Sequence, residues 1–331
     1  MTLDATLNVF RAIGEETRLR IMVLLARGEL TVTEITQILG QSQPRVSRHL
    51  KILADAGLVE RYREGSWMFY RAVESGAPKN LAAIKDALDD LGRADDRLIA
   101  RDGERFTQSR AARARAAAAY FEENAAEWDR VRQLHLPESD IESRMRALVG
   151  DKAVELFVDL GTGTGRMLEI FSDRYHQGVG FDLSREMLSV ARANLDRAGV
   201  HNAQVRHGDL FALPLESGSA DLVCLHQVLH FLAEPGAAVR EAARLLKPGG
   251  RLLISDFAPH ELEFLRDEHA HRRLGFADEE VRAWRRAAVL DLAASETLSP
   301  LASDKEKLTV KIWVLAAPEG VRRLKARASA A

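Results

Sequence analysis

"AVELFVDLGTGTGRMLEIF", residues 153–171, joins a short apolar run to a glycine-rich turn and the beginning of a helix. Residues 156–160 suit a buried parallel strand, and residues 161–165 form the turn. Further along, "GVGFDLS", residues 178–184, repeats the strand pattern and contains Asp182. Strand, glycine turn, helix, strand and acid predict an α/β nucleotide-binding arrangement in which the acid binds a ribose diol.

The spacing of the glycines separates two classes of nucleotide-binding protein. A dinucleotide-dependent oxidoreductase, the alternative, would carry G-x-G-x-x-G with its third glycine at position 166. That position is Arg166, and the glycines follow G-x-G-x-G at Gly161, Gly163 and Gly165. This form, preceded by Asp159, resembles motif I of class I S-adenosylmethionine-dependent methyltransferases.

The resemblance continues to the end of the fold. "VRHGDLFALPL" (205–215) matches the family's third strand, and "ADLVCLHQVLHFL" (220–232) matches the fourth. "LLKPGGRLLISDF" (245–257) matches the fifth, and "KLTVKIWVLAA" (307–317) matches the late antiparallel strand. The resemblance implies a doubly wound, Rossmann-like, seven-stranded α/β domain, with methyl transfer of the EC 2.1.1 type if it is catalytic.

The resemblance also implies the ligand, S-adenosylmethionine or S-adenosylhomocysteine, and the residues that bind it. Asp182 would accept both ribose hydroxyls, and Asp159 would organise the positively charged amino end. The glycine turn would allow close approach of the backbone. For the two acids the alternative is capping or turn chemistry. The expected cofactor-binding residues are Asp159, Gly161, Thr162, Gly163, Gly165, Asp182, Leu183, Met187, Asp209 and Leu210.

No residue is diagnostic of catalysis, because alignment of the reactants supplies much of the rate of methyl transfer. His226 and His230, four apart after the fourth strand, are the candidates for a base or a helix-borne metal pair. The alternative, which we favour, is that they are ordinary histidines of the fold. His260, His269 and His271 follow in the segment that often shapes the acceptor side. We assign no metal site.

"PRVSRHLKILADAGLVERY", residues 44–62, begins with proline, a favoured residue in a first helical turn. Val46, Leu50 and Leu53 predict the buried face of a helix whose other face is basic. Alternating residues on both sides of Glu64 and Gly65 then predict a two-stranded hairpin. Two earlier helices, a third capped by Thr31 or Thr33, and this hairpin make an α+β winged helix-turn-helix. The alternative is a small helical domain with a solvated basic face.

Residues 5–75 resemble the ArsR family of bacterial repressors. The family implies a homodimer that places one recognition helix per subunit in successive major grooves of operator DNA. The wing would meet the flanking minor groove. The expected DNA contacts, to base edges or phosphates, are Gln43, Arg45, Ser47, Arg48, His49 and Arg63.

Many members of this family sense metals, and here the sequence departs from them. Val32 and Thr33 stand where the cysteines of the best-known site would lie, and the expected dimer helix, residues 78–98, contains no histidine. We therefore expect no metal sensing at the usual positions. The single cysteine, Cys224, also excludes a disulfide framework.

Four leucine and isoleucine residues spaced three and four apart predict a dimer helix: Leu81, Ile84, Leu88 and Leu91. From Arg93 to Ala119 the chain is rich in charge and alanine, which predicts a solvated linker helix. Tyr120, Phe121 and Trp128 are expected in a lid or entrance helix of the second domain. The expected domains are 1–78 (winged helix-turn-helix), 79–119 (dimer and linker helices), 120–317 (methyltransferase) and 318–331 (basic flexible tail).

The bulk composition sets limits on function. The chain has 331 residues, 46% of them hydrophobic, and a net charge of −2, so DNA affinity must come from a local patch. The amino terminus has no apolar run of signal-peptide length, and no stretch is apolar enough to span a membrane. We expect a cytoplasmic protein that does not bind membranes.

Two hypotheses follow. In the first, the protein is a transcriptional regulator whose methyltransferase-type domain senses S-adenosylmethionine or S-adenosylhomocysteine. The resemblance implies control of methionine-cycle genes. In the second, it is an active methyltransferase of a small-molecule acceptor with an attached DNA-binding domain.

Overall fold

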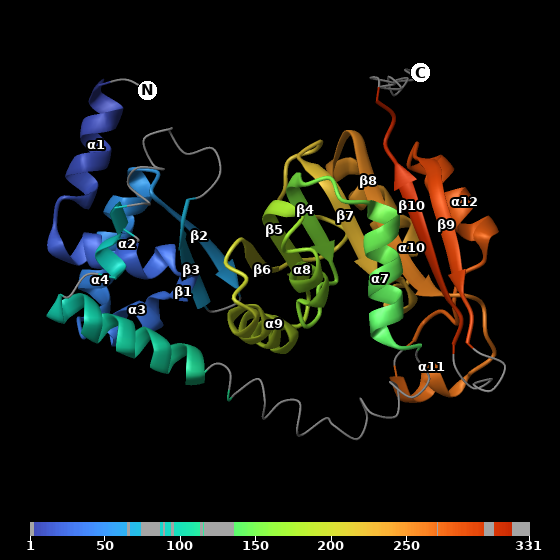
Figure 1. The fold of residues 1–331 in the computed structure, drawn as a ribbon, viewed down its shortest axis with the longest axis horizontal. Helices are drawn as coiled ribbons and strands as arrows, with labels where there is room; N and C mark the ends of the chain where they lie inside the picture. The colour runs from blue at the N-terminus through green and yellow to red at the C-terminus, as the bar shows by residue number, and fades with distance from the viewer. Residues whose placement is uncertain are drawn as a thin grey trace, which may run out of the picture. The chain divides into compact units, whose positions relative to one another are not determined.

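The computed structural model describes residues 3–64, 67–73, 87–88, 90–93, 96–112, 115, 136–269, 271–300 and 308–319 (Figure 1). The chain divides into two compact units, Met1–Ala119 and Tyr120–Ala331. Each unit is described by itself. No helix of the described residues is both long and apolar enough to cross a bilayer.

The first unit begins with helices whose ends follow from local sequence. Thr31 caps the third helix, since its side chain accepts a hydrogen bond from the Glu34 N–H while the Glu34 carboxylate accepts from the Thr31 N–H. Gly40 ends that helix in the left-handed conformation, as predicted. The elements are α1 (Leu3–Ile13), α2 (Glu16–Ala26), β1 (Leu30–Thr31), α3 (Val32–Leu39) and α4 (Gln43–Asp55).

The predicted hairpin is present and forms the wing. Strands β2 (Val59–Glu64) and β3 (Trp67–Ala72) pair antiparallel, from Val59 opposite Ala72 to Glu64 opposite Trp67. The short strand β1 pairs with the other edge of β3. Burial does not alternate along β3, where the consecutive residues Phe69 and Tyr70 are both buried in the unit. Helix, turn, helix and hairpin thus make a winged helix-turn-helix.

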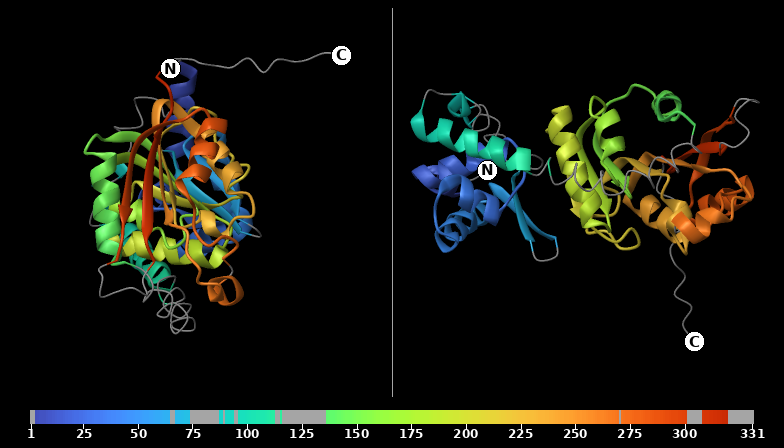
Figure 2. Two further views of the ribbon diagram at one scale, coloured as in Figure 1. Left: turned by 90° about the vertical axis from the view of Figure 1, so that its right-hand side faces the viewer. Right: turned by 90° about the horizontal axis from the view of Figure 1, so that it is seen from below.

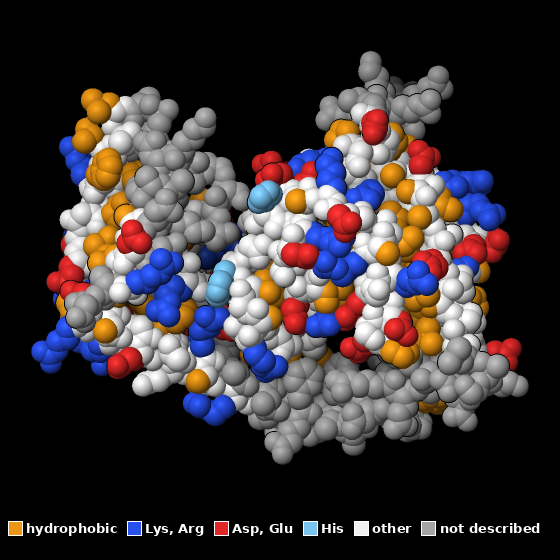
Figure 3. Space-filling view, viewed as in Figure 1, with side chains coloured by type: hydrophobic (Ala, Val, Ile, Leu, Met, Phe, Trp, Pro, Cys, Tyr) orange, Lys and Arg blue, Asp and Glu red, His pale blue; other side chains and the backbone are white. Residues whose placement is uncertain are grey.

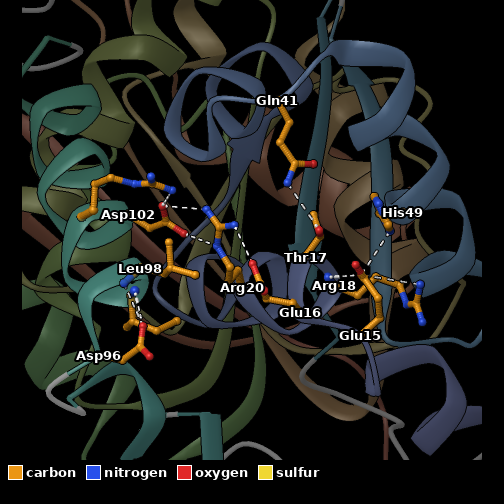
Figure 4. A network of polar contacts seen from close by, with 12 residues as sticks. Glu15, Glu16, Thr17, Arg18, Arg20, Gln41, His49, Asp96, Leu98 and Asp102 are labelled. Carbon is orange, nitrogen blue, oxygen red and sulfur yellow. Dashed lines mark hydrogen bonds and ion pairs between the residues drawn. The ribbon is translucent and has the colours of Figure 1, made fainter.

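The prediction of a solvated linker is wrong for the helix over residues 97–112. Phe106 and Asp102 are each 2% exposed, and Phe106 belongs to the same hydrophobic core as α2, α3 and α4. Asp102 makes a two-pronged ion pair with buried Arg20 of α2, at 2.7 and 3.0 Å (Figure 4). The Arg105 guanidinium donates to the Ile38 carbonyl oxygen of α3. The charged, alanine-rich composition predicted an exposed helix because only a few of its residues make the contacts that bury it.

The seam predicted for a dimer helix is described only in part. Leu81 and Ile84 lie outside the described residues. Leu88 is buried in the core of its own unit, and Leu91 packs against that core. The described half of the seam therefore faces inward.

The second unit is built on a seven-stranded sheet in the order β6-β5-β4-β7-β8-β10-β9. Neighbouring strands from β6 to β8 run parallel, and β10 is antiparallel to both β8 and β9. This is the predicted seven-stranded doubly wound sheet with its late antiparallel strand. The strands are β4 (Val154–Leu160), β5 (Tyr175–Asp182), β6 (Ala203–His207), β7 (Ala220–His226), β8 (Leu246–Phe257), β9 (Asp291–Leu298) and β10 (Val310–Ala316).

Helices cover both faces of this sheet (Figure 2). Successive residues of β7 point to opposite cores: Val223 packs with α10 and α12, whereas Cys224 packs with α7, α8 and α9. Burial on both faces explains why the central strands read as continuous apolar runs. The helices are α7 (Glu138–Val149), α8 (Arg166–Ile170), α9 (Arg185–Ala198), the 3-10 turn η1 (Leu229–Phe231), α10 (Pro235–Leu245), α11 (Phe264–His269) and α12 (Asp278–Ala287).

Two further expectations fall outside the described residues. These are the lid helix with Tyr120, Phe121 and Trp128, and most of the basic tail, from residue 320 onward.

Candidate functional site

Helix α4 presents the basic face that the sequence predicts. Val46, Leu50 and Leu53 are fully buried and fix the orientation of the helix. On its outer side Gln43, Arg45, Arg48 and Lys51 are exposed, and Ser47 is half-buried. Arg45 and Arg48 lie within the first two turns of the helix, the part of a recognition helix that reaches base edges.

His49 lies differently from the other predicted DNA contacts. Its side chain is 13% exposed, and its Nδ1 atom is 3.4 Å from the Glu15 carboxylate beside α2 (Figure 4). Burial lowers the pKa of His49, although the charge of Glu15 opposes the shift. His49 therefore joins α4 to its own fold, which makes it less accessible than the arginines of the predicted set.

The wing carries fewer exposed cations than its sequence suggests. Arg61 and Arg63 are exposed on β2. Arg71 of β3, which the sequence places with them, is 8% exposed, and its Nε atom is 3.8 Å from a Glu60 carboxylate oxygen. Arg71 is therefore part of the packing of the unit.

In the second unit the predicted acids gather where parallel strands end. Asp159 is the penultimate residue of β4, Asp182 ends β5, and Asp209 follows β6. The carboxyl ends of adjacent parallel strands meet at one edge of a sheet, and ligands of open α/β folds bind outside that edge. The order β6-β5-β4 makes these strands neighbours.

Asp182 fixes the glycine turn. Its Oδ2 atom accepts a hydrogen bond from the Gly163 N–H at 2.9 Å, and its Oδ1 atom accepts one from the Ser184 N–H at 2.8 Å. The capping chemistry that the sequence left as an alternative is therefore present. The Asp182 carboxylate can still accept further hydrogen bonds, because each oxygen has a second lone pair.

Asp159 is a buried acid without a partner. It is 1% exposed, and neither carboxylate oxygen has a hydrogen-bond partner among the described residues. Burial raises the pKa of Asp159 to about 7; the nearby Thr162 hydroxyl opposes the rise, and the negative charge of Asp182 adds to it. A buried acceptor left unsatisfied is costly, and such groups concentrate at binding sites.

The three positions of the turn require glycine for different physical reasons. A Cβ atom at Gly161 would lie 2.3 Å from Val228 Cγ2, and one at Gly165 would lie 3.1 Å from the Ala191 Cβ of α9. At Gly163 a Cβ atom would meet no atom closer than 4.0 Å. Gly161 and Gly165 therefore serve close packing, whereas the backbone at Gly163 borders open space that a ligand can occupy.

A first prediction concerns Gly161, whose φ is +73°. Gly161→Ala should lower the free energy of unfolding of the second unit by about 3 kcal/mol, because strain at positive φ adds to a clash with a rigid valine. Urea unfolding monitored by circular dichroism measures this.

Gly199→Ala is the matched control. Gly199 has a φ of +69° at the end of α9, but a Cβ atom there meets nothing within 4 Å. It should lose only the conformational term, about 1 kcal/mol. Equal losses in the two variants would show that contact with Val228 does not matter.

The remaining predicted cofactor residues lie around this turn. Leu183 is 58% exposed, Met187 is half-buried, and Asp209 is exposed, with Oδ1 accepting from the Phe211 N–H. Leu210 is buried in the hydrophobic core, so only its backbone is free to meet a ligand. Thr162 is 5% exposed, and its hydroxyl has no partner among the described residues.

His226 and His230 do not share a helix. His226 ends β7, and His230 lies in η1 with 3% of its surface exposed. The structure instead pairs His230 with an acid that the sequence analysis missed, because its Nδ1 atom is 2.8 Å from the Asp256 Oδ1 atom of β8. The signal for it was an aspartate inside an otherwise apolar strand, in "LLISDF". Among the described residues no group of three or more His, Cys, Asp or Glu is placed to hold a metal ion.

Comparisons with known proteins agree with this geometry. Residues 15–61 match the family model described as bacterial regulatory protein, arsR family, and residues 158–254 match that of a methyltransferase domain. The chain is an arsR-family regulatory domain joined to a methyltransferase domain. The sequence prediction of both families is confirmed.

Relatives match one part or the other. An uncharacterized HTH-type transcriptional regulator of Methanocaldococcus jannaschii is 45% identical over 82 residues, which cover 24% of this chain and 91% of that protein. An arsenic resistance transcriptional regulator of Pseudomonas putida is 47% identical over 64 residues, which cover 19% of this chain and 50% of that protein. An arsenite methyltransferase of Aquipseudomonas alcaligenes is 33% identical over 171 residues, which cover 43% of this chain and 49% of that protein. The chain thus spans about half the length of the curated relatives it matches first.

Proposed function

We propose that this protein is a DNA-binding transcriptional regulator whose methyltransferase-type domain binds S-adenosylmethionine or S-adenosylhomocysteine. The observation that carries the proposal is the unsatisfied, buried Asp159 carboxylate next to the open backbone of Gly163. It occurs in one chain with a helix-turn-helix whose basic face is exposed.

The donor set fits this ligand. The ammonium group of its amino acid end would satisfy Asp159, and its ribose diol would use the free lone pairs of Asp182. Leu183 and Met187 would flank the adenine, and Asp209 with the backbone of Leu210 would meet its edge. The ligand thus supplies a donor to the buried Asp159 carboxylate and further donors to Asp182.

The proposal includes operator DNA and a second copy of the chain as partners, and control of methionine-cycle genes in the cytoplasm. An apolar face on α1, with Leu3 75% and Phe10 60% exposed, supports dimerisation (Figure 3). Gln43, Arg45, Ser47, Arg48 and Arg63 would contact DNA, with His49 holding α4 in place.

The arsenic chemistry in the names of two relatives is not part of the proposal. Arsenite, like other soft centres, is held by thiolates. This chain has one cysteine, Cys224, which is fully buried, and burial raises its pKa well above the ordinary value. A single thiol that stays protonated inside the sheet is not a thiolate site.

The deciding experiment measures operator affinity with and without each ligand. Duplexes selected by the protein from a random pool serve as operators, and fluorescence anisotropy gives the affinity. We expect one of the two ligands to change the affinity by about fivefold or more, the usual range of coupling between two sites. Equal affinities in all conditions would remove the sensor function, because a ligand that does not distinguish two states shifts nothing.

A second prediction separates the two units. Arg48→Ala should weaken operator binding by about tenfold or more and reduce the slope of log affinity against log salt by about 1 if Arg48 contacts a phosphate. Calorimetric affinity for S-adenosylhomocysteine should not change. Arg240→Ala, which removes an exposed arginine from α10, should leave both affinities intact. Full operator affinity in the Arg48 variant would contradict the assignment of α4 as recognition helix.

A third prediction uses the pKa of Asp159, which burial raises to about 7. A bound ammonium favours the ionised carboxylate, so binding must release a proton below that pKa. Affinity for S-adenosylhomocysteine should therefore rise about tenfold from pH 6 to pH 8 and then level off. This ligand has no sulfonium charge to perturb its own amino group.

Asp159→Asn supplies the control for this dependence. The variant should bind more weakly, and its affinity should be flat across the same range. A rise of equal size in the variant would assign the proton to another group.

The second candidate function is an active small-molecule methyltransferase attached to the same DNA-binding domain. The observation that favours it is the buried His230–Asp256 pair near the glycine turn. Transfer of a labelled methyl group to an added acceptor tests it, and the two functions are compatible.

A further inference from the structure

Five histidines of the second unit lie along the segments that follow β7 and β8. His226 and His230 follow or end β7, and His260, His269 and His271 follow β8. The His230 and His271 rings are 4.2 Å apart between centroids, and His230 lies 5.0 Å from the Phe257 ring. Phe257 is 6.1 Å from His260. His230, His260, His271 and Phe257 therefore form one cluster of imidazole and benzene rings, which we call the histidine cluster.

The cluster and His226, which interacts electrostatically with His230, contain buried nitrogen atoms that need a partner. His226 Nδ1, His260 Nε2 and His271 Nδ1 are shielded from solvent and have no hydrogen-bond partner among the described residues. Burial lowers the pKa of His226 to about 4 and that of His271 to about 3, so both rings are neutral at physiological pH. Buried polar atoms are almost always satisfied in native proteins, so this concentration points to a polar ligand.

Asp256 sets the tautomer of His230. It is fully buried, and its carboxylate accepts hydrogen bonds from the Leu229 N–H at 3.0 Å and the Phe257 N–H at 2.8 Å. A carboxylate so placed requires a donor at His230 Nδ1, which is 2.8 Å away. With the proton on Nδ1, the lone pair of the His230 ring is on Nε2.

The cluster adjoins the glycine turn. A Cβ atom at Gly161 would strike Val228, which lies between His226 and His230 in the chain. The Gln227 N–H donates to the Ser255 carbonyl oxygen at 2.7 Å, and Gln227 has a φ of +48°, so this bend is held in a costly conformation. The bend after β7, which leads into the histidine cluster, therefore lies at the same sheet edge as Asp159.

We propose that His230 is the general base of a methyl transfer to a small, neutral acceptor with a phenolic or enolic hydroxyl group, and that Asp256 is its positioning residue. The proposal rests on binding of S-adenosylmethionine, as proposed above. Neutral imidazoles and flat rings favour a planar, uncharged acceptor over a carboxylate, a phosphate or a soft metalloid.

The acceptor oxygen forms a bond to the methyl carbon, the carbon–sulfur bond breaks, and its electron pair remains on sulfur, which loses its positive charge. The hydroxyl proton passes to His230 Nε2, and Asp256 stabilises the imidazolium that results. The proton and the positive charge thus end on the His230–Asp256 pair.

The test uses the full chain, S-adenosylmethionine with a labelled methyl group, and two acceptors, phenol and 4-nitrophenol, at a pH where only 4-nitrophenol is ionised. With phenol, His230→Gln should lower the rate by about 100-fold or more, the usual contribution of a general base. With 4-nitrophenol, which needs no base, the loss should be much smaller. A merely structural role of His230 would lower both rates equally and would overturn the proposal.

Two measurements keep this test separate from the proposed function. Calorimetry should show unchanged S-adenosylhomocysteine affinity in His230→Gln and in the matched control His176→Gln, an exposed histidine of β5 with 72% of its side chain accessible. Proton NMR of the unmodified protein should show a low-field Nδ1–H resonance that disappears in His230→Gln and in Asp256→Asn, and that shifts when phenol is added to the S-adenosylhomocysteine complex.

The outcomes are distinct. Loss of S-adenosylhomocysteine binding in the unmodified protein would refute the proposed function itself. Intact binding with no transfer to either phenol and no shift of the resonance would refute the acceptor class alone. Transfer with an unchanged rate in His230→Gln would refute the base.

Discussion

Asp182→Ala should abolish measurable binding of S-adenosylmethionine and S-adenosylhomocysteine. The variant loses the acceptors proposed for both ribose hydroxyls, and hydrogen bonds to a charged group contribute about 1.5–3 kcal/mol each. It also releases the Gly163 and Ser184 N–H groups that the carboxylate holds at 2.9 and 2.8 Å. The affinity should therefore fall by at least about 100-fold, as measured by calorimetry.

The control for Asp182 is Asp173→Ala, which removes a carboxylate that is 61% exposed in an ion pair with Arg146. Its ligand affinity should equal that of the unmodified protein. If Asp182→Ala kept normal affinity while remaining folded, the assignment of the ligand to this sheet edge would be wrong. Operator binding without ligand should persist in both variants, because neither residue lies in the winged helix-turn-helix.

The largest loss of stability is expected from Asp102→Ala. Arg20 is 5% exposed and its guanidinium is held by two hydrogen bonds to Asp102, so the variant leaves a buried cation without its counter-ion. Breaking such a pair costs about 3–5 kcal/mol. Urea unfolding of the full chain, followed by tryptophan fluorescence and circular dichroism, should show early unfolding of the first unit.

Two comparisons identify the cause of that loss. Glu16 also contacts Arg20, at 3.4 Å, but its side chain is 68% exposed, so Glu16→Ala should cost less than about 1 kcal/mol. The double variant Arg20→Met with Asp102→Leu removes both charges and should recover most of the stability, because apolar replacements of buried pairs are often neutral. A double variant as unstable as Asp102→Ala would show that packing, not the unpaired charge, causes the loss.

Much of the fold could be predicted because local chemistry and long-range structure agree. Thr31, Glu34 and Gly40 mark the ends of α3 in the sequence and do so in the structure. The G-x-G-x-G turn, the acids at the ends of β4 and β5, and the antiparallel β10 followed from spacing and from one family resemblance. Each of these signals is local, so a sequence displays it directly.

The errors and omissions share a cause, since they depend on contacts between distant parts of the chain. Asp102 looks like any charged residue of an exposed helix until Arg20, 82 residues earlier, is found opposite it. Asp256 and His230 are 26 residues apart, and only the neighbouring positions of β7 and β8 bring them together. Arg71 appears to belong to the wing surface because periodicity does not reveal that Glu60 on the paired strand covers it.

The packing of residues 97–112 against the winged helix also has an evolutionary consequence. A regulator of this kind is not exchangeable as a module that ends at the wing. A recombination event that joined a foreign domain after residue 78 would remove Asp102 and Phe106. It would leave Arg20 buried in the remaining core without its counter-ion. A gene fusion that keeps a working winged helix-turn-helix must therefore keep the chain through about residue 112. The helix over residues 97–112 is thus inherited together with the DNA-binding domain.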